Sequence, residues 1–263
     1  MPELPEVETY RRYIESTSMH RPIMRAEAKH PLIVRPFQAR TISTAVEGSA
    51  FLRSYRHGKN LFLELSRGGW LTWHFGMTGE PVFFERMRDE PPHDRFLFTF
   101  ENGHLAFSDA RMLGRIGVTA SPDEYVREKK LGPDVLTLTE ADFTRILERS
   151  RGAAKMVLMD QHKMSGVGNL YSDEALFQSG IDPRAPVQCL GSGDKERLYH
   201  NVRKVLRRSI ERGGDLSRLP QTYLLRHRSR GERCPRCGGD LLSIHLGGRT
   251  SYFCPHCQRE GGT

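Results

Sequence analysis

The hydrophobic positions near the N-terminus follow a helical period. Val7, Tyr10 and Ile14 recur at intervals of three to four residues, which places them on one face of a helix over residues 3–18. Pro5 falls in the first turn of this helix, where an N–H group would have no intrahelical partner. The opening residues are therefore predicted to lead directly into a helix.

From about Ile42 to Val118 the pattern changes to short runs that are typical of β-strands. The clearest runs are NLFLELS, WLTWHFGM, RFLFTF and HLAFSD. The last two are separated by Glu101, Asn102 and Gly103, which together predict a hairpin turn. Several strands without intervening helices favour a β-sandwich or a barrel.

The second half of the chain returns to helical periods. Residues 120–143 are polar and contain prolines, so they are predicted to connect two domains. The longest helix beyond this connection has Asp194 as its expected N-cap and Gly213-Gly214 as its end. Helical periods are found at residues 142–150, 153–161, 171–179 and 194–212.

The composition indicates a globular protein with a strongly basic C-terminal part. The 263 residues are 37% hydrophobic, enough for two modest domains, and no apolar run approaches the roughly 18–20 residues that cross a bilayer. We therefore expect a soluble, cytoplasmic protein that does not bind membranes. The net charge is +8, and residues 195–263 contain 15 Lys and Arg against 6 Asp and Glu. This excess suits a polyanion such as DNA, but a solubilising surface would have the same charge.

Four of the five cysteines form two C-x2-C pairs, with sixteen residues between the pairs. This spacing is typical of a zinc ribbon, in which each pair presents two thiolates from one tight turn. Nothing in the sequence indicates the oxidising compartment that disulfides would need. We expect a half-buried thiol at the fifth cysteine, Cys189. The predicted ligands of one structural Zn²⁺ ion are Cys234, Cys237, Cys254 and Cys257.

Two glycine-containing segments in this half offer contacts for an anion. Gly247-Gly248 separates two β-type runs, which predicts a hairpin with Arg249 at or beside its tip. Gly166 and Gly168 precede Asn169 at the start of a helix, where backbone N–H groups can form an anion cradle. An exposed turn arginine and an ordinary glycine-rich turn remain open as alternative interpretations.

The N-terminal half contains a second group of candidates. Lys59 begins a strand beside His57, where it is either a phosphate contact or a solvated lysine. Met77, Arg111 and Leu113 follow strand-like runs and precede glycines, so we expect them at loop tips. Apolar side chains there can enter a duplex where a base is extruded, and an arginine can bond the orphaned base. Buried loop packing is the alternative.

The N-terminus itself has a potential nucleophile. Removal of Met1 would leave Pro2 as a free secondary amine, with Glu3 and Glu6 nearby. A secondary amine condenses with an aldehyde-level carbon to give a permanently cationic iminium ion, which is an effective electron sink.

Taken together, PELPEVE, GK at 58–59, HFGMTG, SGVGNLY with EALF, and the ribbon with GGRTSYFC resemble the formamidopyrimidine-DNA glycosylase and endonuclease VIII family. The similarity covers the whole chain, and the N-terminus is closer to the formamidopyrimidine branch. The resemblance implies an α+β fold with three domains: a catalytic β-sandwich with flanking helices in 1–130, a helix-two-turn-helix DNA-binding domain in 131–225 and a zinc finger in 226–263. It also implies a monomeric, nucleoid-associated bacterial protein that binds damaged double-stranded DNA.

The same resemblance implies a base excision repair enzyme that removes an oxidised base and then cleaves the strand as an AP lyase. Pro2 would attack C1′ of the damaged nucleotide, and β- and δ-elimination would follow from the iminium ion. Glu3 would be the general acid or base, and Glu6 would position Pro2 or its water.

The family's DNA contacts also match positions of this chain. Lys59 and Arg249 would complete the catalytic set by holding the phosphates around the flipped nucleotide, and Asn169 would contact the same phosphates. Glu174 resembles a carboxylate that supports this part of the DNA-binding site. The side chains that would enter the duplex are those of Met77, Arg111 and Leu113.

Two departures from the family pattern concern the substrate. The segment between Gly214 and Cys234 is short for the branch that caps 8-oxoguanine with a long loop, and Leu113 stands where that branch usually has phenylalanine. Formamidopyrimidines and 8-oxoguanine are the expected substrates, with oxidised pyrimidines or hydantoins as the alternative. A non-catalytic damage-binding protein would share the charge and the ribbon, but it would not explain why Pro2, Glu3 and Glu6 occur together.

Overall fold

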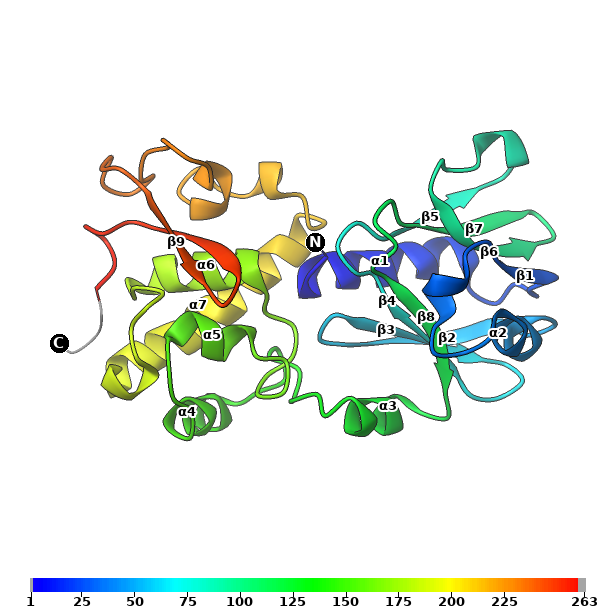
Figure 1. Ribbon diagram of the computed structural model, residues 1–263, viewed down its shortest axis with the longest axis horizontal. Helices are drawn as coiled ribbons and strands as arrows, with labels where there is room; N and C mark the ends of the chain where they lie inside the picture. Colours follow the sequence, from blue (N-terminus) through cyan, green and yellow to red (C-terminus); the bar gives the residue numbers. More distant parts are fainter. Residues whose placement is uncertain (1, 260–263) are drawn as a thin grey trace. The chain divides into compact units, whose positions relative to one another are not determined.

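The computed structural model describes residues 2–259, so Met1 and its predicted removal lie outside the described residues. The chain divides into two compact units, Met1–Lys130 (unit 1) and Leu131–Thr263 (unit 2), which are blue to green and green to red in Figure 1. Hydrophobic side chains are buried in the interior of each unit. No helix in the described part is both long and apolar enough to cross a bilayer.

Unit 1 is a β-sandwich of two four-stranded antiparallel sheets, which confirms the predicted fold class. The first sheet has the order β1-β6-β7-β5, with strands Arg25–Ala28, Asp94–Phe100, Gly103–Ser108 and Glu80–Phe84. The second has the order β2-β3-β4-β8, with strands Phe51–His57, Asn60–Leu65, Trp70–His74 and Arg115–Thr119.

Aromatic side chains from both sheets form the core of the sandwich. Trp73 of β4 packs edge-on against Phe107 of β7 with ring centroids 5.2 Å apart, and Phe51 of β2 meets Phe98 of β6 at 5.5 Å. The Asn-Gly hairpin signal is also confirmed, because Phe100 pairs with Gly103 across a two-residue turn. The two sheets are therefore fixed face to face by the alternating inward positions of their strands.

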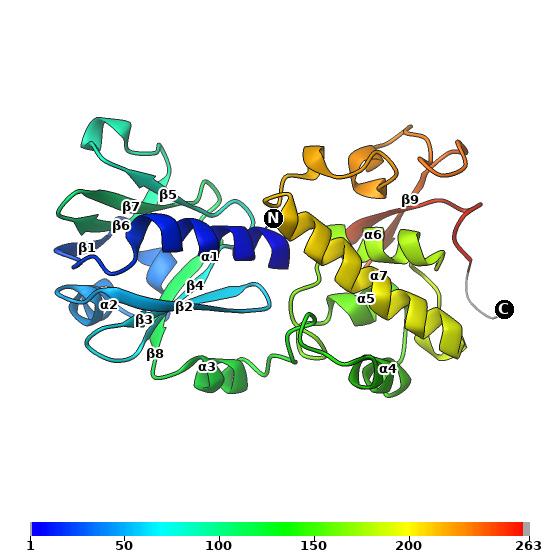
Figure 2. The same ribbon diagram turned by 180° about the vertical axis from the view of Figure 1, so that it is seen from behind.

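The helices of unit 1 cover the sandwich. Helix α1 (Leu4–Ser18) buries Val7 and Ile14 as the sequence predicts, and Figure 2 shows it lying along the strands. A second helix lies in a segment predicted as strand, so that assignment was wrong. A third helix lies within the predicted connection 120–143, which is confirmed because the boundary between the two units falls there. Helix α2 (Ala39–Val46) buries Ile42, and helix α3 (Pro122–Glu128) is capped by Ser121. The unit also has 3₁₀ turns at Pro31–Val34 and Met87–Asp89.

Unit 2 contains four α-helices among its described residues, each within a few residues of its predicted place. They are α4 (Glu140–Glu148), α5 (Ala154–Met159), α6 (Asn169–Ser179) and α7 (Ser192–Glu211). The described part of the unit also has 3₁₀ turns at Val187–Cys189, Leu216–Arg218 and Leu224–His227. A hairpin of strands β9 (Leu242–Leu246) and β10 (Arg249–Phe253) completes it.

The predicted cap of α7 was wrong. Helix α7 begins at Ser192 after the N-cap Gly191, so Asp194 lies inside the first turn. There its Oδ2 accepts the backbone N–H of Gly191 at 3.2 Å. A carboxylate in the first turn satisfies an otherwise unpaired donor as a capping residue would, which explains the misassignment.

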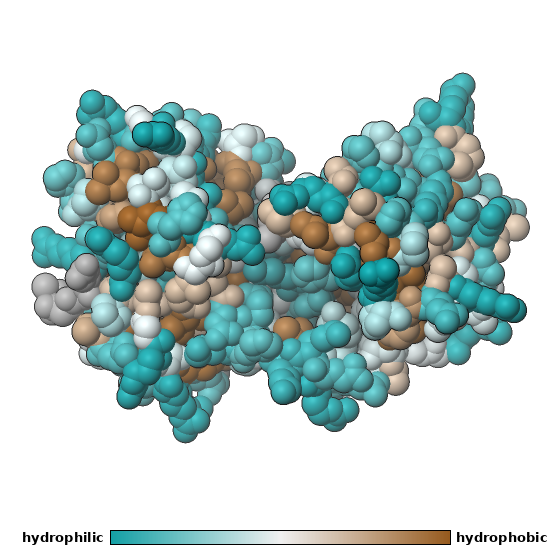
Figure 3. Space-filling model, in the orientation of Figure 1, coloured by the Kyte–Doolittle hydropathy of each residue, from teal (hydrophilic) through white to brown (hydrophobic). Residues whose placement is uncertain are grey.

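Hydrophilic residues predominate on the face of the molecule shown in Figure 3, and hydrophobic residues form scattered patches. Single exposed apolar residues are common on soluble proteins. The large exposed hydrophobic residues include Leu113, one of the predicted loop-tip residues, with an exposed fraction of 45%. The exposure of Leu113 therefore indicates a function only together with the position of its loop.

Candidate active site and nucleic-acid contacts

At the start of α1, the Glu6 carboxylate lies close to the backbone of Glu3, the residue that follows Pro2. Glu3 is the N-cap, and its backbone N–H donates to Oε2 of Glu6 at 2.8 Å. Glu6 lies in the first turn, where the partial positive charge of the helix N-terminus stabilises an ionised carboxylate. Pro2 and Glu3 are both buried. This arrangement fixes the direction from which the chain enters the helix.

The nitrogen of Pro2 has two chemical states, depending on processing. While Met1 is attached, this nitrogen belongs to an amide and is not nucleophilic. Removal of Met1 turns it into a secondary amine with the Glu6-bound backbone of Glu3 directly after it. Any covalent chemistry at Pro2 therefore requires the processed chain.

Lys59 lies in the two-residue turn between β2 and β3. The turn requires a positive φ of 57° at Gly58, a conformation that glycine adopts without a steric penalty. Burial, followed by the positive charges of Lys59 and Arg115, lowers the pKa of His74 to about 4. A neutral His74 fits its hydrogen bond, because Nδ1 accepts the N–H of Gly76 at 3.2 Å. Lys59 is thus a cation beside an uncharged imidazole.

The turn with Met77 and the loop with Arg111 and Leu113 are packed against each other. A Cβ atom on Gly76 would lie 2.5 Å from the backbone of both Leu113 and Gly114, so the two backbones are in close contact. Arg111 and Leu113 are exposed, and Met77 is half-buried. Arg111 and Leu113 thus do not have the buried loop packing that was the alternative interpretation.

Asp109 joins these two loops, although nothing in its sequence context marks it as a functional residue. Its buried carboxylate accepts from the Thr78 hydroxyl at 2.5 Å, from the Arg111 N–H at 3.2 Å and from the Gly114 N–H at 2.8 Å. In the sequence, an aspartate between a strand and a glycine looks like an ordinary turn residue. The β4–β5 turn, the β2–β3 turn and the start of α1 all lie at one end of unit 1 (Figures 1 and 2).

In unit 2, Asn169 is the first residue of α6, directly after the N-cap Gly168. The turn before it is bridged by Gln161, whose amide donates to the Val167 carbonyl at 2.8 Å and accepts from the Gly166 N–H at 3.0 Å. Oδ1 of Asn169 is buried and has no hydrogen-bond partner among the described residues. The Nδ2 end of this amide is therefore the end that can reach an anion at the helix N-terminus.

Arg249 is exposed at the tip of the β9–β10 hairpin, as the sequence predicts. It pairs with Leu246 across Gly247-Gly248, both of which have positive φ angles, 54° and 72°. A Cβ atom on Gly247 would lie 2.3 Å from Cε of Met156, so the tip packs directly onto α5. A larger residue at Gly247 would have to push the end of the Met156 side chain aside and adopt the strained positive φ of 54°.

The four ribbon cysteines form a zinc site. Their Sγ atoms all lie within 4.8 Å of one another, with 3.8 Å between Cys234 and Cys257 and 3.5 Å between Cys237 and Cys254. Four thiolates at Zn–S distances of about 2.3 Å in a tetrahedron are about 3.8 Å apart, so the geometry fits one structural Zn²⁺ ion. Cys189 is exposed, so the prediction of a half-buried thiol there was wrong.

Glu174 is fully buried in α6, so it does not present a surface for DNA in this structure. Its carboxylate accepts the Leu225 N–H at 2.8 Å and the Gln178 amide at 2.6 Å. Burial raises the pKa of Glu174 to about 7, although these two hydrogen bonds lower it. The carboxylate therefore anchors the segment before the zinc ribbon from inside the unit.

The raised pKa predicts a pH-dependent stability that Glu174→Gln should remove. Between pH 4.5, the ordinary value, and about 7, the folded chain binds a proton that the unfolded chain has lost. The unfolding free energy of the wild type should fall across this window by up to about 3 kcal/mol relative to the variant, and the difference should stay constant above it. Urea unfolding from pH 5 to 8 measures this. Parallel curves for the two proteins would show that Glu174 does not titrate in this range.

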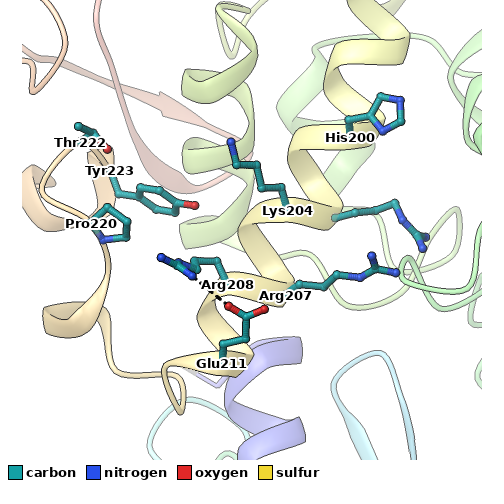
Figure 4. Close-up of a pocket in the computed structure, with 9 residues that line it drawn as sticks. His200, Lys204, Arg207, Arg208, Glu211, Pro220, Thr222 and Tyr223 are labelled. Carbon is teal, nitrogen blue, oxygen red and sulfur yellow. Dashed lines mark hydrogen bonds and ion pairs between the residues drawn. The ribbon is translucent and has the colours of Figure 1, made fainter.

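A basic cavity of about 600 Å³ lies between α7 and the segment that follows it (Figure 4). Among the described residues that line it, four are Lys or Arg and one, Glu211, carries a carboxylate, which lies 3.2 Å from Arg208. Some of the excess basic residues of segment 195–263 are therefore gathered around this cavity. Its lining residues are His200, Arg203, Lys204, Arg207, Arg208, Glu211, Pro220, Thr222 and Tyr223.

Three family models match the chain in succession. The formamidopyrimidine-DNA glycosylase N-terminal domain matches residues 1–116, and the H2TH domain of the same proteins matches residues 131–221. A zinc finger found in FPG and IleRS matches residues 231–259. The chain belongs to the formamidopyrimidine-DNA glycosylase and endonuclease VIII family of base excision repair enzymes. Within this family it belongs to the formamidopyrimidine-DNA glycosylase branch.

Similar proteins match over nearly the whole chain. The formamidopyrimidine-DNA glycosylase of Desulfitobacterium hafniense is 32% identical, over 98% of this chain and all of the relative, and that of Thermus thermophilus is 36% identical, over 99% and 100%. The Lactococcus lactis enzyme bound to DNA with an AP site superimposes with a TM-score of 0.90 at 29% identity, covering 98% of this chain and 100% of that one. Its complex with Fapy-dG-containing DNA gives 0.89 at 28%, with the same coverage.

Proposed function

We propose that this protein excises oxidised purines, namely formamidopyrimidines and 8-oxoguanine, from double-stranded DNA and then cleaves the strand as an AP lyase. The observation that carries the proposal is the start of α1, where Pro2 becomes a secondary amine after processing and the Glu6 carboxylate binds the next backbone N–H at 2.8 Å. The relatives' complexes with Fapy-dG-containing DNA and with AP-site DNA support the same assignment.

The proposed reaction begins when the Pro2 amine attacks C1′ and the bond from C1′ to the damaged base breaks. Glu3 donates and accepts the protons that the leaving base and the opening sugar require. The resulting iminium ion acidifies the C2′ proton, and its loss expels the 3′ phosphate by β-elimination. A second elimination expels the 5′ phosphate and leaves a one-nucleotide gap. Glu6 holds the backbone at Glu3 so that the amine keeps its direction.

The remaining candidates bind the substrate in this proposal. Lys59, Asn169 and Arg249 contact the phosphates around the flipped nucleotide, as a lysine, a helix N-terminus and an exposed arginine can. Met77 and Leu113 fill the space of the extruded base, and Arg111 bonds the orphaned one. Buried Glu174 supports the site from the interior by holding the segment around Leu225.

We also propose the three-domain division at residues 1–130, 131–225 and 226–263, with a monomer as the working form. Separate family matches to the H2TH and zinc-finger segments support two domains within unit 2. The similar proteins come from bacteria, which supports action on the nucleoid in a bacterial cytoplasm. Sedimentation of the free protein and of its DNA complex tests whether one protein chain is present in each.

Borohydride trapping tests the proposed activity. Processed wild type, with a proline N-terminus verified by mass spectrometry, is mixed with duplexes that contain formamidopyrimidine, 8-oxoguanine, dihydrouracil or an abasic site. We expect a covalent adduct and a one-nucleotide gap, fastest on the abasic duplex and on the oxidised purines. Faster cleavage at dihydrouracil would instead assign endonuclease VIII-like specificity. Tight binding without an adduct on any duplex would refute catalysis and indicate a damage-binding protein.

A further inference from the structure

Asp173 connects three separate segments of unit 2 through one buried carboxylate. Oδ1 accepts the Ser251 hydroxyl at 2.5 Å and pairs with the ammonium group of Lys155. Oδ2 accepts from the Arg228 guanidinium at 2.9 Å and from the backbone N–H of Tyr252 at 3.1 Å. The side chains of Asp173 and Lys155 are both completely buried. The donors come from α5, from the segment before the ribbon and from strand β10.

This carboxylate lies between two residues that the proposed function assigns to phosphates. Asp173 follows Asn169 by four residues, so both occupy the same face of α6. Ser251 follows Arg249 by two residues, so both point to the same side of the hairpin. The Asp173–Ser251 hydrogen bond is therefore a short link from the N-terminus of α6 to the tip of the hairpin.

Arg228 adds a second connection to the same part of the hairpin. Besides its bond to Asp173, it donates to the Thr250 carbonyl at 2.7 Å, and its guanidinium lies over the Tyr252 ring, 5.1 Å from the centroid. Arg228 thus contacts Thr250 and Tyr252, and Asp173 bonds Ser251 between them, so all three residues directly after Arg249 are held. The zinc ligand Cys254 lies farther along, beyond Phe253 at the base of the hairpin.

We propose that Asp173 is a positioning residue that fixes Arg249 relative to Asn169, so that both contact the phosphates of one flipped nucleotide. The proposal rests on the proposed function of Asn169 and Arg249. Zinc holds the base of the hairpin, and Asp173 holds the part next to its tip. A carboxylate with two donors on each oxygen suits this role, because moving the hairpin would leave buried donors and acceptors unpaired.

A double-mutant cycle between Ser251→Ala and Arg249→Ala tests the link. Ser251→Ala removes one hydrogen bond to Asp173 and leaves the buried ion pair intact. In the protein that retains Arg249, we expect it to raise KM on an abasic duplex about tenfold, with kcat and zinc content changed little. In the Arg249→Ala background the same substitution should change KM less than about twofold, because the group that it positions is already missing.

Ser243→Ala is the matched control, since Ser243 is exposed on the partner strand opposite Tyr252. It should leave KM unchanged in both backgrounds. The proposal would be overturned if Ser251→Ala raised KM by the same factor in the protein that retains Arg249 and in the Arg249→Ala variant. It would also be overturned if Ser251→Ala left KM unchanged in the protein that retains Arg249. An inactive wild type would instead refute the proposed function, which keeps the two failures apart.

A paired variant tests Asp173 itself. Asp173→Asn alone would remove the carboxylate partner of the buried Lys155 ammonium group and could unfold the unit, so it is combined with Lys155→Met. The pair removes both charges together. With zinc retained, verified by metal analysis, we expect at least the KM increase of Ser251→Ala and the same dependence on Arg249. A wild-type KM in this variant would also overturn the proposal.

Discussion

Pro2→Gly is expected to abolish borohydride trapping on an abasic duplex, or to slow it by a factor on the order of 100 or more. Glycine leaves a primary amine, whose imine must gain a proton before it can withdraw electrons, whereas the proline iminium is permanently cationic. Single-turnover trapping and strand cleavage on the same duplex measure the effect. Binding to an uncleavable abasic analogue should stay within about twofold of wild type, because the proposed phosphate contacts are unchanged.

A preparation that retains Met1 is the chemical control for this prediction. Its side chains are identical to those of the processed protein, but the nitrogen of Pro2 is an amide. The retained form, separated and verified by mass spectrometry, should trap no DNA. Trapping of either Pro2→Gly or the Met1 form at the wild-type rate would mean that another amine is the nucleophile.

Zinc removal is expected to weaken DNA binding at least about tenfold while the β-sandwich of unit 1 remains folded. Structural zinc sites contribute about 10–16 kcal/mol of apparent binding free energy, and the ribbon is too small to compensate for that loss with a core of its own. Chelation, or Cys254→Ser, should disorder the base of the β9–β10 hairpin and with it Arg249. Affinity for an abasic-analogue duplex and near-UV circular dichroism of the Trp73 core together separate the two effects.

Cys189→Ser is the matched control, because Cys189 is exposed and lies outside the group of four ribbon cysteines. It should retain one zinc ion per chain and wild-type affinity. Unchanged affinity after verified zinc loss would remove the ribbon from the proposed DNA contact.

Local patterns determined much of the fold. The period of Val7 and Ile14, the Asn-Gly turn before β7 and the paired cysteines each act over a few residues, and the structure has all three as expected. The two short helices that the pattern does not reveal have competing local signals. The helix around Ile42 is a single short amphipathic segment beside a long β-region, and α3 lies in a polar segment whose Ser-Pro start looks like a loop.

Candidate residues were recognisable where their chemical type and position are unusual in themselves, as for Pro2, Lys59, Asn169 and Arg249. Asp109 and Asp173 were not recognisable, because an aspartate after a strand or inside a helix has many ordinary explanations. Their importance comes from partners far away in the sequence. Thr78 bonds Asp109 from 31 residues away, and Ser251 bonds Asp173 from 78 residues away.

The sequence by itself determined the groups that can react or bind: a proline at position 2 with two nearby carboxylates, a lysine and an arginine at glycine turns, and four thiolates at ribbon spacing. Only the tertiary structure decided which buried carboxylates hold those groups in place, and that Glu174 supports the site from the interior. The physical reason is that chemical identity belongs to single residues, whereas burial and hydrogen-bond saturation depend on which distant segments pack together.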